Sequence, residues 1–214
     1  MHVLITGANR GIGAALANAY REGGHRVMAT ARDGSTGATL DVTSPESHAA
    51  LAHSLDADAV DLLICNAGVY LDKSENLGDG FPTQMWADSF AVNVTGVFLT
   101  VQTLLPNLQS AEAPKVAILS SQMASHERAP GGSYIYRSSK AAALNLGRNL
   151  AHDLHCLGIA VGIYHPGWVR TEMGGDSADI SVAEAVAGLQ ARFEALTLET
   201  TGCFETWDGR PHPY

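Results

Sequence analysis

The stretch that decides the fold is MHVLITGANRGIGAALANAY, residues 1–20. It opens with an apolar run that ends at Thr6, passes through three glycines, and closes with apolar residues at helical spacing. A strand, a glycine turn and a helix in this order bring backbone N–H groups and a helix N-terminus toward a pyrophosphate. We therefore expect this turn to bind a dinucleotide through Gly7, Asn9, Arg10, Gly11, Ile12 and Gly13. A turn with a purely structural role has the same pattern.

Apolar runs of strand length recur along the chain, at residues 26–30, 60–65, 116–119 and 159–164. Between them lie amphipathic helical patterns, the clearest of which runs from Trp86 to Leu105. Alternating strands and helices predict right-handed βαβ units. The expected fold class is therefore α/β: a single-domain, Rossmann-like, doubly wound parallel sheet with helices on both faces. This one dinucleotide-binding domain would span residues 1–214.

The composition limits the partners and the location. The chain has 214 residues, of which 46% are hydrophobic, and its net charge of -9 disfavours nucleic acid and anionic membranes as partners. Its three cysteines and scattered histidines form no disulfide or metal pattern, and no apolar stretch reaches about 18 residues. Because the first strand begins at His2, there is no room for a signal peptide. We expect a cytoplasmic protein with no membrane span and no metal.

Two arginines favour a phosphorylated dinucleotide. Arg10 lies within the glycine turn, and Arg32 follows the second strand, where dinucleotide folds often place an acid on the adenosine ribose. That acid position holds Ala31, so a 2′-phosphate would meet two guanidiniums and no carboxylate there. We expect NADP(H) rather than NAD(H) as the cofactor. The alternative is that either arginine is a solvated surface cation.

The segment Tyr136-Arg137-Ser138-Ser139-Lys140 begins a second helical pattern, residues 136–157. Residues four apart share a helix face, so the phenol and the ammonium can point into one pocket. A nearby ammonium stabilises phenolate and brings the ordinary phenol pKa of about 10 toward neutrality. The pattern favours proton transfer by Tyr136 with help from Lys140, although pairs at this spacing are also common on surfaces.

Other polar residues lie where a parallel sheet binds ligands. Ser120 and Ser121 follow the strand at 116–119, and a hydroxyl there either holds a substrate oxygen or forms a turn. Asn93 is polar among the apolar residues of the first helical pattern. A buried amide needs partners, so it either bridges parts of the structure or anchors an ordered water.

Taken together, these motifs resemble the short-chain dehydrogenase/reductase superfamily over nearly the whole chain. In order they are Thr6-Gly7-xxx-Gly11-x-Gly13, Asp41-Val42, Cys65-Asn66-Ala67-Gly68, Asn93, Ser120-Ser121, Tyr136-xxx-Lys140 and Pro166-Gly167-Trp168-Val169-Arg170-Thr171. The family usually carries asparagine where this chain has Cys65. The interval from Ser121 to Tyr136 is slightly longer than in many members.

The resemblance implies a role for each matching residue. Tyr136 would be the general acid and base, while Lys140 would lower its pKa and bond the nicotinamide ribose. Ser121 would orient the carbonyl, and Asn93 would hold a relay water. The adenosine side would be lined by Asp41, Val42, Asn66, Ala67 and Gly68, with strand bracing as the alternative role of Asn66. The nicotinamide end would be held by Pro166, Gly167, Val169 and Thr171.

Within the superfamily, the small size and the stretch 165–175 resemble the C-factor (C-signal) and sniffer-type carbonyl reductases. The implied substrate is a small-molecule carbonyl or alcohol. Residues 172–200 would form a substrate-side lid and helix. The lid itself, Glu172 to Ser181, is short, which indicates an open pocket. The helices at 86–108 and 136–157 resemble those through which family members pair, so we expect a homodimer or homotetramer.

Two other functions compete with this interpretation. A regulatory or signalling module would sense the dinucleotide without turnover, yet such proteins often lose the tyrosine or the lysine. A sugar-nucleotide epimerase would need a larger substrate region than the roughly forty residues after Thr171. The connection at 32–40 is too short for a full crossover helix, and the tail after Gly202 is expected to give a final strand and a cap.

Overall fold

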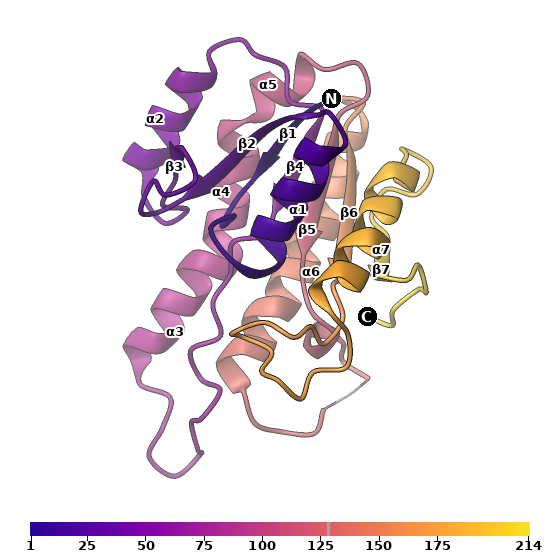
Figure 1. Ribbon diagram of the computed structural model, residues 1–214. Helices are drawn as coiled ribbons and strands as arrows, with labels where there is room; N and C mark the ends of the chain where they lie inside the picture. Colours follow the sequence, from indigo (N-terminus) through magenta and orange to yellow (C-terminus); the bar gives the residue numbers. More distant parts are fainter. Residues whose placement is uncertain (128) are drawn as a thin grey trace.

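The computed structural model describes residues 1–127 and 129–214. A seven-stranded sheet lies at its centre in the order β3-β2-β1-β4-β5-β6-β7, and every neighbouring pair is parallel (Figure 1). The strands are β1 His2–Ile5, β2 Arg26–Ala31, β3 Ala38–Thr39, β4 Leu62–Cys65, β5 Lys115–Leu119, β6 Ala160–His165 and β7 Phe204–Thr206. The predicted parallel, Rossmann-like sheet is confirmed.

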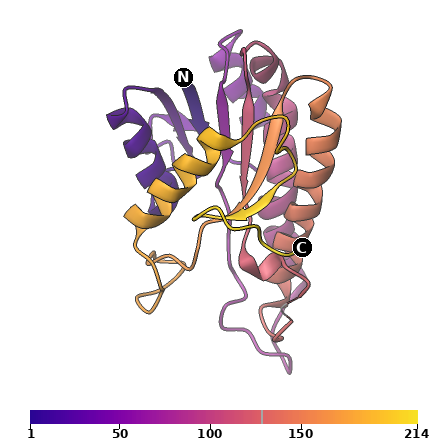
Figure 2. The same ribbon diagram turned by 90° about the vertical axis from the view of Figure 1, so that its right-hand side faces the viewer.

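Helices cover both faces of this sheet (Figure 2). α1 (Gly11–Glu22) and α7 (Val182–Ala195) pack against each other on one side. The opposite layer holds α2 (Pro45–Leu55), α3 (Thr83–Phe90), α4 (Gly96–Thr103), α5 (Leu105–Gln109) and α6 (Tyr134–His155). Alternate strand residues serve the two layers, because successive side chains of a strand point to opposite faces. Val3 and Ile5 therefore pack in the core beneath α1 and α7, whereas Leu4 packs in the core beneath the other layer.

The longest predicted helical pattern is interrupted in the structure. One turn of π-helix, Ala91–Thr95, separates α3 from α4, and Leu104 separates α4 from α5. Pro106 explains the second break, because it has no N–H to continue the helical bonding. The first break was not predictable from apolar spacing, which shows the buried side but not where an extra residue widens a turn. The widened turn carries Asn93.

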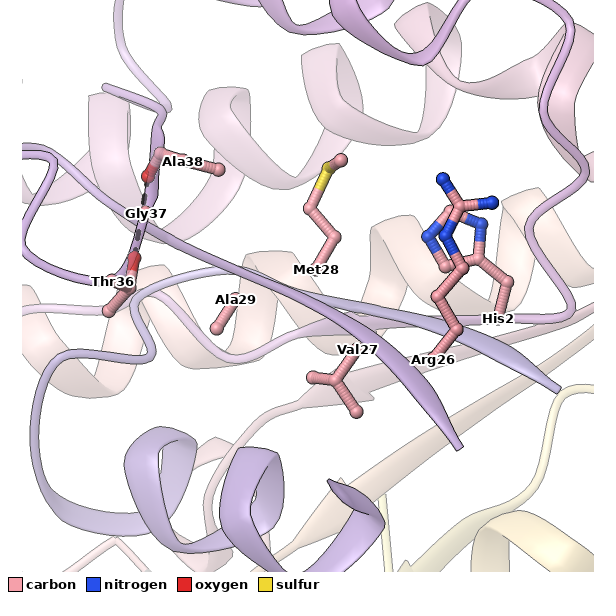
Figure 3. A pocket seen from close by; sticks show the side chains of 8 residues that line it. All are labelled: His2, Arg26, Val27, Met28, Ala29, Thr36, Gly37 and Ala38. Atoms are coloured by element: carbon pink, nitrogen blue, oxygen red, sulfur yellow. Dashed lines mark hydrogen bonds between the residues drawn. The ribbon is translucent and has the colours of Figure 1, made fainter. Parts of the chain in front are cut away.

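The predicted short connection between β2 and β3 contains no helix, and β3 pairs only with Thr30 and Ala31. The rest of β2 borders an open hollow of about 200 Å³, lined by residues 26–29 and 36–38 together with His2. Figure 3 shows Met28 between the Arg26 and His2 side chains at one end and residues 36–38 at the other. None of the residues expected to bind cofactor or substrate lines this hollow.

The tail forms its predicted strand, β7, and then caps its own chain. The backbone carbonyl of Tyr214 accepts a 3.1 Å hydrogen bond from the N–H of His126. The guanidinium of Arg148 lies 4.0 Å from the centroid of the Tyr214 ring. In the part of the chain that the structure describes, none of the helices has both the length and the hydropathy needed to cross a bilayer.

Candidate active site

The glycine turn packs directly against the residues that follow β4. Gly7 has φ +64°, and a Cβ built on it would lie 2.8 Å from Cα of Ala67. Asn66 Nδ2 donates to the carbonyls of Thr6 and Gly7 at 2.9 and 2.8 Å, while the Thr6 hydroxyl accepts the N–H groups of Asn66 and Ala67. The Asn66 amide therefore braces the turn. Its structural alternative describes these contacts better than a lining of the adenosine side.

The turn fits the pyrophosphate of a dinucleotide. A Cβ on Gly13 would lie 2.4 Å from the Gly7 carbonyl oxygen, so only glycine allows the backbone to approach this closely. Gly11 has φ +55°, and a Cβ built on it would lie 3.7 Å from the Thr171 methyl group. The first turn of α1 carries no acidic residue, and Arg10 at its N-cap makes no side-chain capping bond. The first N–H groups of α1 are therefore available to an anion, and no carboxylate of that turn competes for them.

Carboxylates lie near both arginines. The exposed Arg10 forms an ion pair with Glu172, and Arg32 is close enough to Asp41 to help lower its pKa, after the dominant hydrogen bonds from Thr43. Asp33 follows Arg32, and hydrogen bonds from Ser35 and, more weakly, Asn9 hold the pKa of Asp33 below its ordinary value. Position 31 lacks an acid, as the sequence indicates, and the exposed Asp33 adds a carboxylate two residues later, near Asn9 of the glycine turn.

The two adenosine-side residues after β3 face in different directions. Asp41 Oδ1 accepts the N–H and the hydroxyl of Thr43 at 2.9 and 2.7 Å, which leaves the other carboxylate oxygen without a partner among the described residues. Val42 is buried in the core and lies against the start of α4, where a Cβ on Gly96 would be 2.8 Å from its Cγ2. Any contact of Val42 with a cofactor is therefore limited to its backbone.

The structure brings the Tyr136 ring and the Lys140 ammonium near each other, both buried, near the start of α6. The two residues are only 8% and 6% exposed, and Lys140 Nζ lies 5.8 Å from the centroid of the Tyr136 ring. Gly68 borders the same space, because a Cβ on it would lie 3.3 Å from Lys140 Nζ. Glycine at position 68 keeps this space open beside the ammonium.

The surroundings of Tyr136 shift its pKa. Burial raises it to about 12, the Ser121 hydroxyl opposes that rise, and Tyr70 and Asp72 add to it. Lys140 is not among the groups that shift it here; burial lowers the pKa of Lys140 itself to about 8, and its ammonium donates to the Leu119 carbonyl at 2.9 Å. Burial therefore dominates the pKa of Tyr136, and the lowering of that pKa by Lys140 stays a prediction.

The two serines after β5 have separate contacts. The Ser120 hydroxyl donates to the backbone carbonyl of Lys140 at 3.0 Å and so ties α6 to the end of β5. The Ser121 hydroxyl accepts the N–H of Met123 at 3.1 Å and is close enough to Tyr136 to lower its pKa. Because the bond from Met123 does not use the hydroxyl hydrogen of Ser121, that hydrogen can be donated to the Tyr136 oxygen or, in its place, to a substrate oxygen. This geometry supports the choice of Ser121 over Ser120.

The Asn93 side chain makes hydrogen bonds that connect different parts of the chain. Its Nδ2 donates to the Val69 carbonyl and to the Ser139 hydroxyl, each at 2.9 Å, and its Oδ1 accepts the Val69 N–H at 2.9 Å. The amide thus ties the π-helical turn to α6 and to the segment after β4. With three hydrogen bonds already made, the side chain of Asn93 has little capacity for a water. A relay water would have to use its backbone.

The segment after β6 closes over the glycine turn. Gly167 has φ +92°, and a Cβ on it would lie 2.3 Å from Cδ1 of Ile180. Thr171 accepts the N–H of Gly174 through its hydroxyl, which folds the chain back after the buried Val169. Pro166 at the start of the segment is half-buried. The nicotinamide-side residues expected from the sequence therefore lie on one continuous segment.

Two residues of the site were missing from the sequence interpretation. Tyr70 stacks on Tyr136 with ring centroids 4.2 Å apart and an interplanar angle of 20°. Asp72, 1% exposed, accepts the backbone N–H groups of Ile135 and Tyr136 at 2.8 and 3.2 Å. Both residues lie more than sixty positions before α6, so no local spacing signals either contact.

Comparison with known proteins gives one consistent group. The family model described as short chain dehydrogenase matches residues 1–180. The chain is 35% identical to 1-hydroxy-2-glutathionyl-2-methyl-3-butene dehydrogenase of Rhodococcus sp. (strain AD45), over 97% of this chain and 96% of that one. It is 34% identical to C-signal of Myxococcus xanthus, over 77% of this chain and 99% of that one.

Solved structures give the same result. The carbonyl reductase Sniffer of D. melanogaster superposes with a TM-score of 0.91 at 25% identity, covering 100% of this chain and 99% of that one. The NADPH-bound carbonyl reductase from chicken fatty liver superposes with a TM-score of 0.89 at 27% identity, covering 100% and 98%. The similarity thus extends over the whole described chain, including the tail beyond residue 180.

Replacement of Lys140 by methionine is expected to increase stability at neutral pH. The pKa of Lys140 is about 8 in the folded chain against 10.5 for an ordinary lysine, so between these values the unfolded chain binds the extra proton. Wild-type stability should therefore rise between about pH 8 and pH 10, as the cost of burying the charge disappears. Lys140→Met should lack this rise and gain on the order of 2 kcal/mol at about pH 7.

Urea unfolding across this pH range measures both effects. Lys73→Met is the matched control, because Lys73 is exposed and its ammonium remains solvated. Parallel stability curves for wild type and Lys140→Met would show that the ammonium is not desolvated as described.

Proposed function

The chain belongs to the short-chain dehydrogenase family and is a nicotinamide-dependent oxidoreductase, and we propose that it interconverts a small carbonyl and its alcohol with NADP(H), using Tyr136 as general acid and base. The predicted kinship with C-signal and sniffer-type carbonyl reductases is confirmed. The observation that carries the proposal is the buried Tyr136 phenol, grouped with Ser121 and Lys140 at the carboxyl end of β5. Parallel α/β sheets bind their ligands at that edge.

In a carbonyl reduction, Ser121 and Tyr136 would have different roles. The Ser121 hydroxyl holds the substrate oxygen and polarises the carbonyl, and Tyr136 donates the proton to that oxygen as negative charge develops on it. A bound nicotinamide supplies or accepts the hydride. The Tyr136 phenol is protonated at neutral pH, which is the form that reduction needs, and burial extends this form to higher pH.

The preference for NADP(H) rests on Arg10 and Arg32. A 2′-phosphate would give Arg10 a doubly charged partner in place of Glu172, with which it forms an exposed and therefore weak ion pair. Arg32 would bind the same phosphate from the end of β2. Asp33 would repel the 2′-phosphate and so counteract both arginines, but its exposed carboxylate is screened by solvent. The chicken carbonyl reductase, a structural neighbour at 27% identity, holds NADPH.

The lid proposed for residues 172–200 is anchored at both sides of the site. Glu172 reaches Arg10 on the cofactor side, and the Met173 carbonyl accepts the ammonium of Lys73 at 3.1 Å on the substrate side. Trp168 Nε1 donates to the Gly174 carbonyl at 2.9 Å and holds the fold of the segment. α7 is packed in the core, but residues 172–177 before it are held mainly by exposed contacts of this kind, so this part can open for a range of small carbonyl substrates.

We also propose that the protein works in the cytoplasm. Cys65 is buried, Cys203 is half-buried and Cys156 is exposed, and all three thiols are free. Free thiols of this kind persist in a reducing compartment, whereas oxidising compartments favour disulfides.

Loss of the Tyr136 hydroxyl should abolish most of the proton transfer. Tyr136→Phe keeps the ring but removes the acid, so kcat for reduction of aldehydes and ketones should fall about 100-fold or more. The dissociation constant for NADPH, measured by fluorescence titration, should change little. Tyr134→Phe serves as the control, because Tyr134 is exposed on the same helix and faces Phe81 instead.

A Tyr136→Phe variant that reduces carbonyls at the wild-type rate would refute the assignment of the proton donor. Tight NADPH binding by the wild type, without turnover on any aldehyde or ketone of a broad panel, would instead favour the dinucleotide sensor.

Loss of the Arg32 guanidinium should change the choice of cofactor. Arg32→Ala removes a charge-assisted hydrogen bond to the 2′-phosphate, so NADPH affinity should fall about 10- to 100-fold while NADH affinity stays nearly constant. Calorimetric titration with each cofactor measures the two affinities. Arg21→Ala is the control, because Arg21 lies in the last turn of α1, at the opposite end from the glycine turn. Equal losses for NADPH and NADH would contradict a 2′-phosphate contact.

The chain is expected to assemble into a homodimer or homotetramer. Trp86 and Phe90 of α3 are half-buried and stack with ring centroids 6.3 Å apart, and Phe98 on α4 is 39% exposed. Apolar side chains that stay accessible on these two helices favour pairing with a second copy. Sedimentation equilibrium should show a dimer or tetramer that Phe98→Glu weakens, whereas a monomeric wild type at micromolar concentration would contradict the proposal.

A further inference from the structure

The helix that carries Tyr136 begins without the cap that its sequence offers. Ser133, the N-cap residue of α6, is of a type that normally accepts an N–H of its own first turn. Its backbone is instead left-handed, with φ 48° and ψ 42°, and its side chain makes no capping bond. The Ser133 hydroxyl meets the Tyr70 hydroxyl at 2.5 Å instead. The N–H groups at the start of α6 therefore need another acceptor.

Asp72 supplies that acceptor from another part of the chain. Its carboxylate binds the N–H groups of Ile135 and Tyr136, the second and third residues of α6, which are the two that an N-cap side chain normally serves. The carboxylate is 1% exposed, so these bonds and the positive end of the helix dipole compensate its buried charge. Because the contact is to the backbone of Tyr136 itself, it fixes where that residue begins.

The same segment also fixes the ring of Tyr136. Tyr70 stacks on it at 4.2 Å, and the Tyr70 hydroxyl is held in turn by Ser133. Asn93 anchors the segment upstream through two hydrogen bonds to the backbone of Val69. The stretch Val69–Asp72 thus contacts Tyr136 at its backbone and on its ring face.

We propose that Asp72, with Tyr70, is a positioning residue that holds the Tyr136 phenol in its reactive place by capping α6 from outside the helix. This inference rests on the proposed function of Tyr136 as the proton donor. Positioning has a cost, because the Asp72 charge disfavours phenolate. The charged or titratable groups that face Tyr136 in the described structure are Asp72 and Tyr70 from the segment after β4 and Lys140 from α6.

Three variants of the segment separate position from charge. Asp72→Ala removes the cap, and a displaced reacting group should lower kcat about tenfold or more while NADPH affinity stays within about threefold. Asp72→Asn retains one acceptor oxygen without the charge, so it should recover most of kcat and let Tyr136 ionise at a lower pH. Tyr70→Leu removes the stacked ring and should lower kcat without exposing the Ile135 and Tyr136 amides. Asp79→Asn is the control, because Asp79 is an exposed acid in the loop that follows the segment and has no hydrogen bond to α6 within the described residues.

Two readouts do not need turnover. Hydrogen exchange at the Ile135 and Tyr136 amides should accelerate in Asp72→Ala and much less in Asp72→Asn. The Cζ resonance of labelled tyrosine, assigned through Tyr136→Phe, should report phenol ionisation at a lower pH in Asp72→Asn than in wild type. If Asp72→Ala does not fold, Asp72→Asn and Tyr70→Leu still provide the kcat, exchange and titration measurements.

The outcomes separate this inference from the proposed function. Wild-type kcat and wild-type amide exchange in Asp72→Ala, or an unchanged ionisation of Tyr136 in Asp72→Asn, would overturn the positioning role even with Tyr136→Phe inactive. A fully active Tyr136→Phe would overturn the proposed function, whatever the exchange data show.

Discussion

The close backbone contact between the glycine turn and the end of β4 is the constraint on which the site depends. Gly7 and Gly13 leave no room for a Cβ, and the Asn66 amide fastens the turn with two bonds to the carbonyls of Thr6 and Gly7. This packing directs the first N–H groups of α1 outward at the point where the strand order reverses. The residues after β4 that brace the turn, Asn66 and Ala67, run directly into the Val69–Asp72 segment. The brace of the cofactor turn and the support of Tyr136 are therefore consecutive parts of one backbone path.

Burial sets the electrostatics of the pocket more than pairing does. Desolvation raises the pKa of Tyr136 and lowers the pKa of Lys140, so each side chain is shifted toward its neutral form. Asp72 stays next to them as a third ionisable group because two backbone N–H groups bind it. Three polar side chains at 8% exposure or less reduce the stability of the fold. A site with this cost is typical of function rather than of packing.

Several interpretations made from the sequence needed the structure to choose between open alternatives. Ser120 and Ser121 are equivalent as adjacent hydroxyls, but the pleat of β5 sends one to the Lys140 carbonyl and the other toward Tyr136. Asn66 and Asn93 were ambiguous between bracing and binding, and their hydrogen bonds show bracing. Position 31 has no carboxylate, but Asp33 supplies one nearby, because a tight turn after β2 brings the Asp33 side chain back toward Asn9.

The sequence by itself determined the parallel α/β fold, the glycine turn, the Tyr136 and Lys140 pair and the family, because each depends on residue types at short, regular spacing. Only the tertiary structure decided which groups surround Tyr136. Tyr70 and Asp72 reach it across more than sixty residues of chain, and the left-handed backbone of Ser133 creates the need for Asp72. Contacts of this kind depend on how distant segments pack together, and no local pattern encodes them.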